Sequence, residues 1–148
     1  MAVYTRVDTK DLTPLLARYG LPPATVFKGI AEGVENSNYL LESDGKRFIL
    51  TLYEKRVKAE ELPYFLDLMD HVVQKGAPAA APMRDTDGVC LQTLCGRPAA
   101  LIEFITGTSP ETPSAHLAEA TGAAMAQYHL ATGDIAGRRP NAQGPDGW

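Results

Sequence analysis

The segment from Gly29 to Arg56 constrains the fold of this 148-residue chain more than any other. It contains two runs rich in aromatic and aliphatic residues, Asn38 to Glu42 and Arg47 to Tyr53. The pair Asp44-Gly45 separates them, and this dipeptide is a strong signal for a two-residue hairpin turn. The sequence therefore predicts an antiparallel hairpin, around which the rest of the chain must build a sheet.

Three further segments have strand character. Thr25 to Ala31 is rich in residues that favour strands, among them Val26, Phe27 and Ile30. Val89 to Leu94 and Ala99 to Ile105 form a second predicted hairpin across Cys95-Gly96-Arg97. Together with the first hairpin, these segments predict five strands.

Helical periodicity occurs on both sides of the first hairpin. The segment from Asp8 to Tyr19 has leucines at helical spacing but contains Pro14, so this helix either starts late, with Thr13 as its cap, or is kinked. The clearest helix runs from Ala59 to Lys75, because one stripe of it is apolar and Gly76 follows as a stop signal.

A third helix is predicted from Pro113 to about Thr132. Thr112 suits its cap and Pro113 its first position, and Gly133 ends it. Its proposed inner side consists of small and apolar residues: Leu117, Ala120, Thr121, Ala124, Tyr128 and Ala131. Such a side needs a packing partner, and the segment that follows, Ile135 to Trp148, has the composition of a loop.

Composition excludes several classes of protein. The net charge of -4 argues against a nucleic-acid binder, and we expect no such partner. No apolar run approaches the about 18 residues of a membrane helix, and Met1 to Asp8 show no secretory signal. Cys90 and Cys95 have neither zinc nor redox-motif spacing, so we interpret them as reduced thiols in a hairpin. We therefore predict a cytoplasmic location without membrane association.

The first bend of the predicted sheet could hold phosphate. Gly29 and Gly33 bracket it, and backbone N–H groups beside glycine can approach phosphate oxygens closely. Asn36, Ser37 and Asn38 add side-chain donors. The alternative is that both glycines are plain turn residues, since the segment matches neither a Walker A loop nor a dinucleotide fingerprint.

The order of elements favours the phosphate interpretation. A glycine turn within a strand ladder, then a helix, then a hairpin leading into an extended link is the order of a kinase amino lobe. Such a lobe carries a lysine on its third strand, paired with a glutamate on its helix. Here the helix offers Glu60 and Glu61, which could equally be solvated acids, and Thr51 occupies the lysine position. Other nearby cationic residues are Lys46, Lys55 and Arg56.

The motifs EGVENSNYLL and FILTLYEKR, followed by ELPYFLDLMDH, GRPAALIEFITG and RPNAQGPDGW, resemble the bacterial homoserine kinases of the aminoglycoside-phosphotransferase-like superfamily. The resemblance covers nearly the whole chain. It implies an α+β fold: a protein-kinase-like N-terminal lobe over residues 1–105, with a five-stranded antiparallel sheet and one long helix. Residues 106–148 would then be the hinge exit and the start of the helical C-terminal lobe. The implied ligands are ATP, Mg²⁺ and L-homoserine, and the implied pathway is threonine biosynthesis.

The resemblance also assigns site residues. Gly29 to Asn38 would cover the phosphates, and Glu61 would be the helix glutamate. Ile102 to Ile105 would be the hinge, with Glu103 and Ile105 contacting adenine. The apolar wall of the base pocket would be Val26, Phe48 and Leu50, for which ordinary sheet core is the alternative.

The residues that transfer phosphate are not found in the chain. In this superfamily they form a His-Gly-Asp segment with a later asparagine and a metal-binding aspartate, and His71, His116 and His129 have other neighbours. We therefore nominate no catalytic or metal-binding residue and expect the magnesium ligands in an absent C-terminal lobe. The expectation is a truncated homoserine kinase that is inactive alone.

Two alternatives remain open. One is a non-catalytic lobe that binds nucleotide or forms a homo-oligomer through the exposed face of helix 113–132, since exposed apolar patches favour association. The other is a different small-molecule kinase of the same superfamily. The sequence does not identify the acceptor substrate directly, nor the group that replaces the lysine at Thr51.

Overall fold

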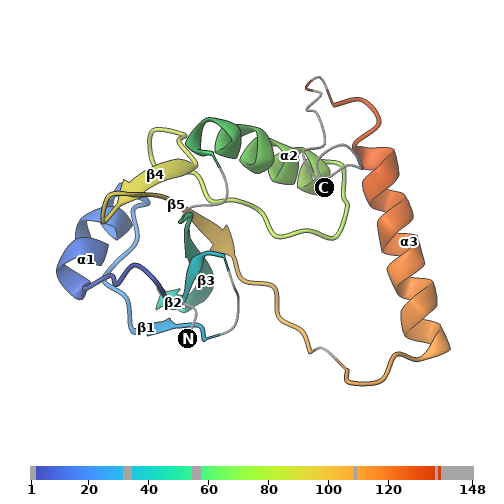
Figure 1. Ribbon diagram of the computed structural model, residues 1–148, viewed down its shortest axis with the longest axis horizontal. Helices are drawn as coiled ribbons and strands as arrows, with labels where there is room; N and C mark the ends of the chain where they lie inside the picture. The colour runs from blue at the N-terminus through green and yellow to red at the C-terminus, as the bar shows by residue number, and fades with distance from the viewer. Residues whose placement is uncertain (1–2, 32–34, 55–57, 109, 136, 138–148) are drawn as a thin grey trace.

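The computed structural model describes residues 3–31, 35–54, 58–108, 110–135 and 137. Its centre is a five-stranded antiparallel sheet with strand order β1-β2-β3-β5-β4 (Figure 1). The strands are β1 (Val26–Gly29), β2 (Ser37–Ser43), β3 (Lys46–Leu52), β4 (Leu91–Leu94) and β5 (Arg97–Glu103). The predicted α+β class and five-stranded sheet are confirmed.

Both predicted hairpins are present, and their turns have the backbone that this geometry requires. Asp44 and Gly45 have φ of 52° and 68°, and Cys95 and Gly96 have φ of 50° and 73°. Positive φ at both central residues is typical of the type I′ turn, whose twist matches that of the flanking strands. The second turn is therefore Cys95-Gly96, and Arg97 already belongs to β5.

The first helix, α1 (Thr9–Arg18), begins before Pro14 and continues through it. Asp8 is the N-cap, and its backbone N–H donates to the Asp11 carboxylate at 3.3 Å, which stabilises the first turn. The late start with Thr13 as cap is therefore wrong.

One face of the sheet packs on α1. Side chains alternate between the faces of a strand, and the side chains of β2, β3 and β5 on this face are buried. With three leucines of α1 they form the main core: Leu12, Leu15, Leu16, Tyr39, Leu41, Phe48, Leu50, Leu52, Ala99 and Leu101. This face is the closed side of the sheet.

The other face packs on α2 (Leu62–Gln74), which follows a 3₁₀ turn, Ala59–Glu61. Leu66 is buried against Ala100 and Ile102, and Met69 packs at the edge of the same cluster. α2 covers only part of this face, and the remainder is open.

The third helix, α3 (Ala115–Ala131), starts later than predicted. Ser114, not Thr112, is the cap, and its hydroxyl accepts a hydrogen bond from the Leu117 N–H at 3.1 Å. α3 stands apart from the sheet and is joined to it by the extended link after β5 (Figure 1). Its predicted inner side is largely exposed, and only Ala131 of α3 is buried.

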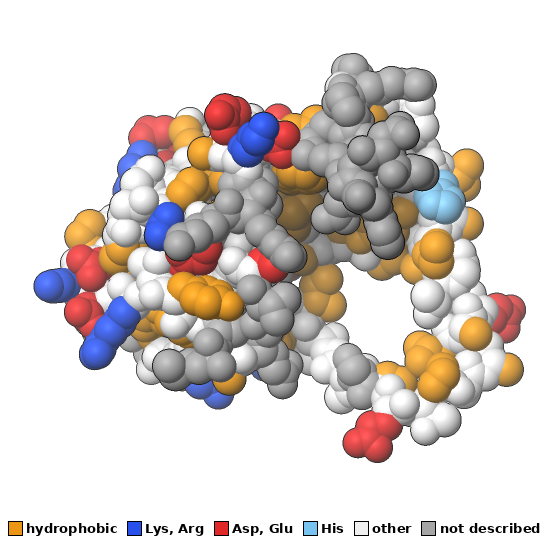
Figure 2. All heavy atoms as spheres, in the orientation of Figure 1, with side chains coloured by type: hydrophobic (Ala, Val, Ile, Leu, Met, Phe, Trp, Pro, Cys, Tyr) orange, Lys and Arg blue, Asp and Glu red, His pale blue; other side chains and the backbone are white. Residues whose placement is uncertain are grey.

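Contacts of α3 with α2 lie near the C-terminal end of α3. The Tyr128 hydroxyl donates to the Pro78 carbonyl at 2.9 Å. Beyond the helix, Asp134 accepts from Lys75 at 2.5 Å and lies 3.0 Å from His71 Nε2. Figure 2 shows an opening between the body of the molecule, the link and α3. None of the helices in the described ranges is long and apolar enough to cross a membrane.

Candidate functional site

A groove of about 480 Å³ lies on the α2 side of the sheet, where β5 passes into the extended link. This volume is within the range of small-molecule sites, and the lining is mainly apolar with a few polar groups, as such sites usually are. The lining comes from β2 and the residue before it, from β3 and the residue after it, from α2 and the segment that follows it, from the end of β5 and from the link. The lining residues are Asn36, Asn38, Ile49, Thr51, Tyr53, Met69, Ala80, Ile102, Glu103, Phe104 and Ile105.

The structure brings four of the predicted site residues together in this groove. Asn36 and Asn38 lie at its β2 end, and Glu103 and Ile105 lie at its β5 end. Thr51, which occupies the expected lysine position, lines the groove between them and donates a hydrogen bond to Asn38 Oδ1 at 2.8 Å. The groove therefore has polar side chains at its β2 end.

Leu50 does not line the groove. Its side chain is fully buried on the α1 face, where Phe48 is its neighbour in the core. A shift of one residue along a strand changes the face that a side chain occupies, and Ile49 and Thr51 are the β3 residues that face the groove. Val26 is also absent from the lining, and Phe48 and Leu50 both belong to the buried core on the α1 side.

Ser37 is likewise turned away from the groove and is fully buried. Its hydroxyl accepts from the backbone N–H groups of Tyr4 and Thr5, at 2.8 and 3.0 Å, and donates to a Glu54 oxygen at 2.6 Å. Ser37 thus attaches the N-terminal segment to the sheet, and its structural role accounts for all of its contacts.

Glu54 is the charged centre of this attachment. Arg97 Nε lies 3.1 Å from the Glu54 carboxylate, and the Thr5 hydroxyl donates to it at 3.0 Å. Burial acts to raise the pKa of Glu54, but the hydrogen bonds from Ser37 and Thr5 and the charge of Arg97 outweigh it, so the pKa is lowered. The group is therefore ionised at neutral pH.

Gly29 has a packing reason to be glycine. A Cβ at this position would lie 2.8 Å from Val3 Cγ2, closer than real side chains approach. The N-terminal segment thus passes directly over Gly29, on the face that carries its strand partner Tyr39. Gly33, the second glycine of the predicted bend, lies outside the described residues.

The expected helix glutamate and the described cationic candidate lie outside the groove. Glu61 ends the 3₁₀ turn before α2 and does not belong to the groove lining. Lys46 lines a second groove of about 490 Å³, together with Phe48 and Met83, rather than the first. Lys55 and Arg56 lie outside the described residues.

The link after β5 is held at its start. The Glu103 N–H donates to the Ala81 carbonyl at 2.9 Å, and the Phe104 N–H donates to the Arg47 carbonyl at 3.3 Å. The Arg47 guanidinium stacks 4.4 Å from the centre of the Phe104 ring and donates to Thr106 at 3.0 Å. The β5 end of the groove is therefore a preformed surface.

Sequence reasoning missed most of the apolar lining. Ile49 and Tyr53 lie on the same face as Thr51, and Met69 and Ala80 come from α2 and the segment after it. The alternation of side chains, counted from Thr51, could have found Ile49 and Tyr53. No local signal marks Met69 or Ala80, because only the packing of α2 brings them to the sheet.

The described residues contain no group of three or more His, Cys, Asp or Glu side chains that could hold a metal ion. Asp134 is paired with Lys75 and His71, and hydrogen bonds from these two groups lower its pKa.

Comparison with known proteins gives a consistent picture. The model of a family described as "Phosphotransferase enzyme family" matches residues 26–148. The chain is 50% identical over 148 residues to a homoserine kinase of Hyphomonas neptunium, covering 100% of this chain and 45% of the relative. Homoserine kinases of Caulobacter sp. and Rhodospirillum rubrum are 50% and 47% identical, again over 100% of this chain and 46% of each relative. The chain thus spans about half the length of the curated relatives it matches.

A solved structure supports the fold. Spectinomycin phosphotransferase, determined in complex with ADP and spectinomycin, matches with a TM-score of 0.56 and 17% sequence identity. The match covers 68% of this chain and 30% of the other protein. The kinase-like architecture predicted from the sequence is confirmed.

Proposed function

Because this chain belongs to the phosphotransferase enzyme family, we propose that it is the nucleotide-binding lobe and hinge of a kinase that transfers phosphate from ATP to the hydroxyl of L-homoserine. The observation that carries this proposal is the groove between Asn38 and Glu103, whose mainly apolar lining has polar side chains at its β2 end. The choice of homoserine is supported by the names of the relatives. The acceptor does not follow from the groove itself.

The β5 end suits a flat heterocycle. The Glu103 N–H points away from β3, toward Ala81, so its carbonyl points to the same outer edge. Ile105 is two residues further, and in an extended chain its N–H reaches this edge too. One acceptor and one donor two residues apart match the amino group and ring nitrogen of adenine. Ile49 and Ile102 would contact the faces of the base.

The β2 end suits phosphate. Asn36 and Asn38 can donate hydrogen bonds through their carboxamide nitrogens, and both line the groove. The triphosphate would then extend across β3, past Thr51, toward the turn that precedes β2. In this proposal Gly29 is the last residue of β1, Gly33 belongs to the chain segment between β1 and β2, and Glu61 is the acid at the start of α2.

In this proposal, Mg²⁺ and the acceptor are bound by residues outside the described part of the chain. The described residues contain no group of three or more potential metal ligands, and in this proposal the groups that hold Mg²⁺ lie outside them. The whole protein's activity is assigned to a chain about twice as long, as in the relatives. The 148 residues alone are accordingly expected to bind nucleotide and to show no homoserine-dependent turnover.

Titration calorimetry with ADP tests the nucleotide assignment. Ala80 lines the groove, so Ala80→Leu should fill it and weaken ADP binding about 10-fold or more, the effect of about 1.4 kcal/mol. Ala118→Leu, the same change on the exposed surface of α3, is the matched control and should bind like the parent chain. Absence of ADP binding to the parent chain would refute the nucleotide assignment.

For the full-length protein, turnover with homoserine but not choline tests the acceptor.

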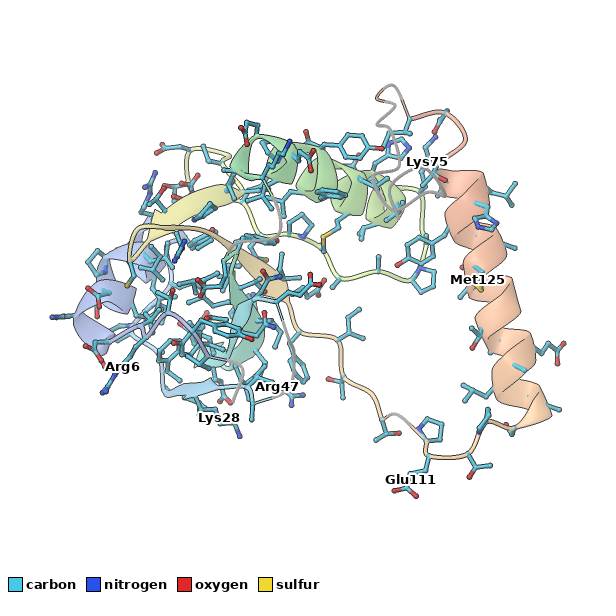
Figure 3. All side chains as sticks on the ribbon, in the orientation of Figure 1. Arg6, Lys28, Arg47, Lys75, Glu111 and Met125 are labelled. Carbon is cyan, nitrogen blue, oxygen red and sulfur yellow. The ribbon has the colours of Figure 1, made fainter. Side chains whose placement is uncertain are left out.

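A second candidate function is association through α3. Leu117, Met125 and Leu130 are 36%, 55% and 81% exposed, and Met125 lies clear of the sheet in Figure 3. Apolar side chains at this exposure favour contact with another surface, and a second copy of the chain is the occupant to test. Light scattering should then give a dimer mass for the parent chain and a monomer mass for Leu130→Glu. A monomeric parent chain would exclude this candidate.

A further inference from the structure

Thr51 holds the Asn38 carboxamide in a defined orientation. The two residues are paired across β2 and β3, and the Thr51 hydroxyl donates to Asn38 Oδ1 at 2.8 Å. A carboxamide accepts hydrogen bonds at its oxygen and donates two at its nitrogen. With the oxygen engaged by Thr51, the nitrogen is directed away from β3, and within the described residues it makes no hydrogen bond.

Asn36 repeats this arrangement more loosely. It also lines the groove, and the Glu54 N–H approaches its Oδ1 at 3.5 Å. Both carboxamides thus have their oxygens directed at donors of the protein, which leaves nitrogen donors at the same end of the groove. Acceptors without a proton, such as phosphate oxygens, are the groups that complement such an end.

We infer that the Asn38 amide, positioned by Thr51, takes the place of the strand lysine of kinase-like lobes as the donor to the nucleotide's phosphates, with Asn36 beside it. Thr51 is then a positioning residue, and Asn38 is the residue that touches the ligand. This inference rests on the proposed function, because it requires a nucleotide in the groove.

The replacement has a physical consequence that distinguishes it from a lysine. A lysine contributes a full charge, whose interaction with phosphate is weakened by salt. An amide contributes a directional hydrogen bond without net charge. Binding of the phosphates should therefore depend strongly on amide orientation and only weakly on ionic strength.

Lys28 is the competing source of charge. It lies on β1 opposite Leu40, on the same face of the sheet as Asn38, and is exposed at the β1 edge (Figure 3). A long flexible side chain at this place could reach the phosphates without any help from Thr51. The two possibilities make opposite predictions for substitutions.

The test compares the affinities of the 148-residue chain for ADP and for adenosine, which lacks phosphate. Asn38→Asp keeps the shape but removes the donors, and should weaken ADP at least about 10-fold, the scale of one hydrogen bond to a charged group. Thr51→Val removes the hydroxyl at nearly constant volume and should weaken ADP about 3-fold to 10-fold by releasing the amide. Adenosine affinity should be unchanged in both variants.

Two further variants make the test specific. Thr51→Ser keeps the hydroxyl and should bind ADP with an affinity within about 2-fold of the parent chain. If the role of Thr51 were purely steric, loss of its methyl group in Thr51→Ser would weaken ADP binding instead. Thr93→Val, the same chemical change at an exposed position of β4, is the matched control and should leave both affinities unchanged. Lys28→Gln should change ADP affinity less than about 2-fold at moderate salt.

The outcomes separate the inference from the proposed function. If adenosine and ADP both bind but Asn38→Asp and Thr51→Val leave ADP affinity unchanged, the inference is wrong and the nucleotide groove stands. If Lys28→Gln weakens ADP binding more than Asn38→Asp does, the Lys28 ammonium group is the main partner of the phosphates, and the inference is again overturned. If neither ligand binds the parent chain, both the inference and the proposed function fail.

Discussion

Leu50 provides the sharpest test of which face of β3 is core and which is groove. The side chain is fully buried beside Leu41 and Leu101. Leu50→Ala removes three carbon groups, each worth about 0.8 kcal/mol when buried, or about 2.4 kcal/mol of transfer free energy. The cavity left behind adds to this, so we expect a loss of about 3–4 kcal/mol in the free energy of unfolding.

The neighbouring residue supplies the comparison. Ile49 is only partly buried and lines the groove, so Ile49→Ala should cost about half as much stability. It should nevertheless weaken ADP binding, whereas Leu50→Ala should leave the affinity of the folded fraction unchanged. Urea unfolding followed by circular dichroism, at constant m-value, measures the first quantity, and calorimetry measures the second.

The reasoning would be refuted by the reverse pattern. A loss below about 1 kcal/mol for Leu50→Ala would mean that the side chain is not in a closed core. A selective effect of Leu50→Ala on ADP affinity, with stability retained, would place Leu50 in the groove after all.

Three further predictions concern the parts that hold the lobe together. The pKa of Glu54 is lowered in the folded state, so its ionised carboxylate stabilises the fold at pH values above the unfolded pKa of about 4.3, and this stabilisation is lost as pH falls through the folded-state pKa. Glu54→Gln should therefore make the free energy of unfolding less dependent on pH on the acid side. An unchanged dependence would contradict this. Gly45→Ala should cost about 1 kcal/mol, because φ is 68° there, whereas Gly107→Ala, in open space without positive φ, is the control in thermal unfolding. Asp134→Asn should speed hydrogen exchange in the last turn of α3, since the Lys75 pairing is lost, and equal exchange rates would exclude a role for that pairing.

The sheet and its turns were predictable because their signals are local. Asp44-Gly45 has a backbone that few other dipeptides adopt easily, so the hairpin and its register follow from two residues. The start of α1 was not predictable from Pro14 alone. The capping interaction between Asp8 and Asp11 stabilises an earlier start, and the helix tolerates the proline.

The face that each strand residue occupies was harder to predict. Along β3 and the residue after it, Phe48, Leu50 and Leu52 alternate with Ile49, Thr51 and Tyr53, and both rows contain large apolar side chains. Alternation therefore separates the two rows but does not say which row is the core. That choice depends on α1, which packs from a distant part of the sequence. The same reason explains why the buried Ser37 was grouped with the groove-lining Asn38.

The attachment of α3 has a mechanical consequence. Within the described residues, the hydrogen bonds that hold it lie at its C-terminal end, where Tyr128 bonds to Pro78 and Asp134, just after the helix, bonds to Lys75 at the end of α2. Its other end is joined to the sheet only through the extended link (Figure 1). A helix of 17 residues is about 26 Å long at about 1.5 Å per residue, so a rotation of about 5° at the anchored end moves the far end by about 2 Å. α2, whose C-terminal end lies at these contacts, also supplies Met69 to the groove wall. A rotation of α3 about its C-terminal contacts is thus separated from the groove by α2 alone.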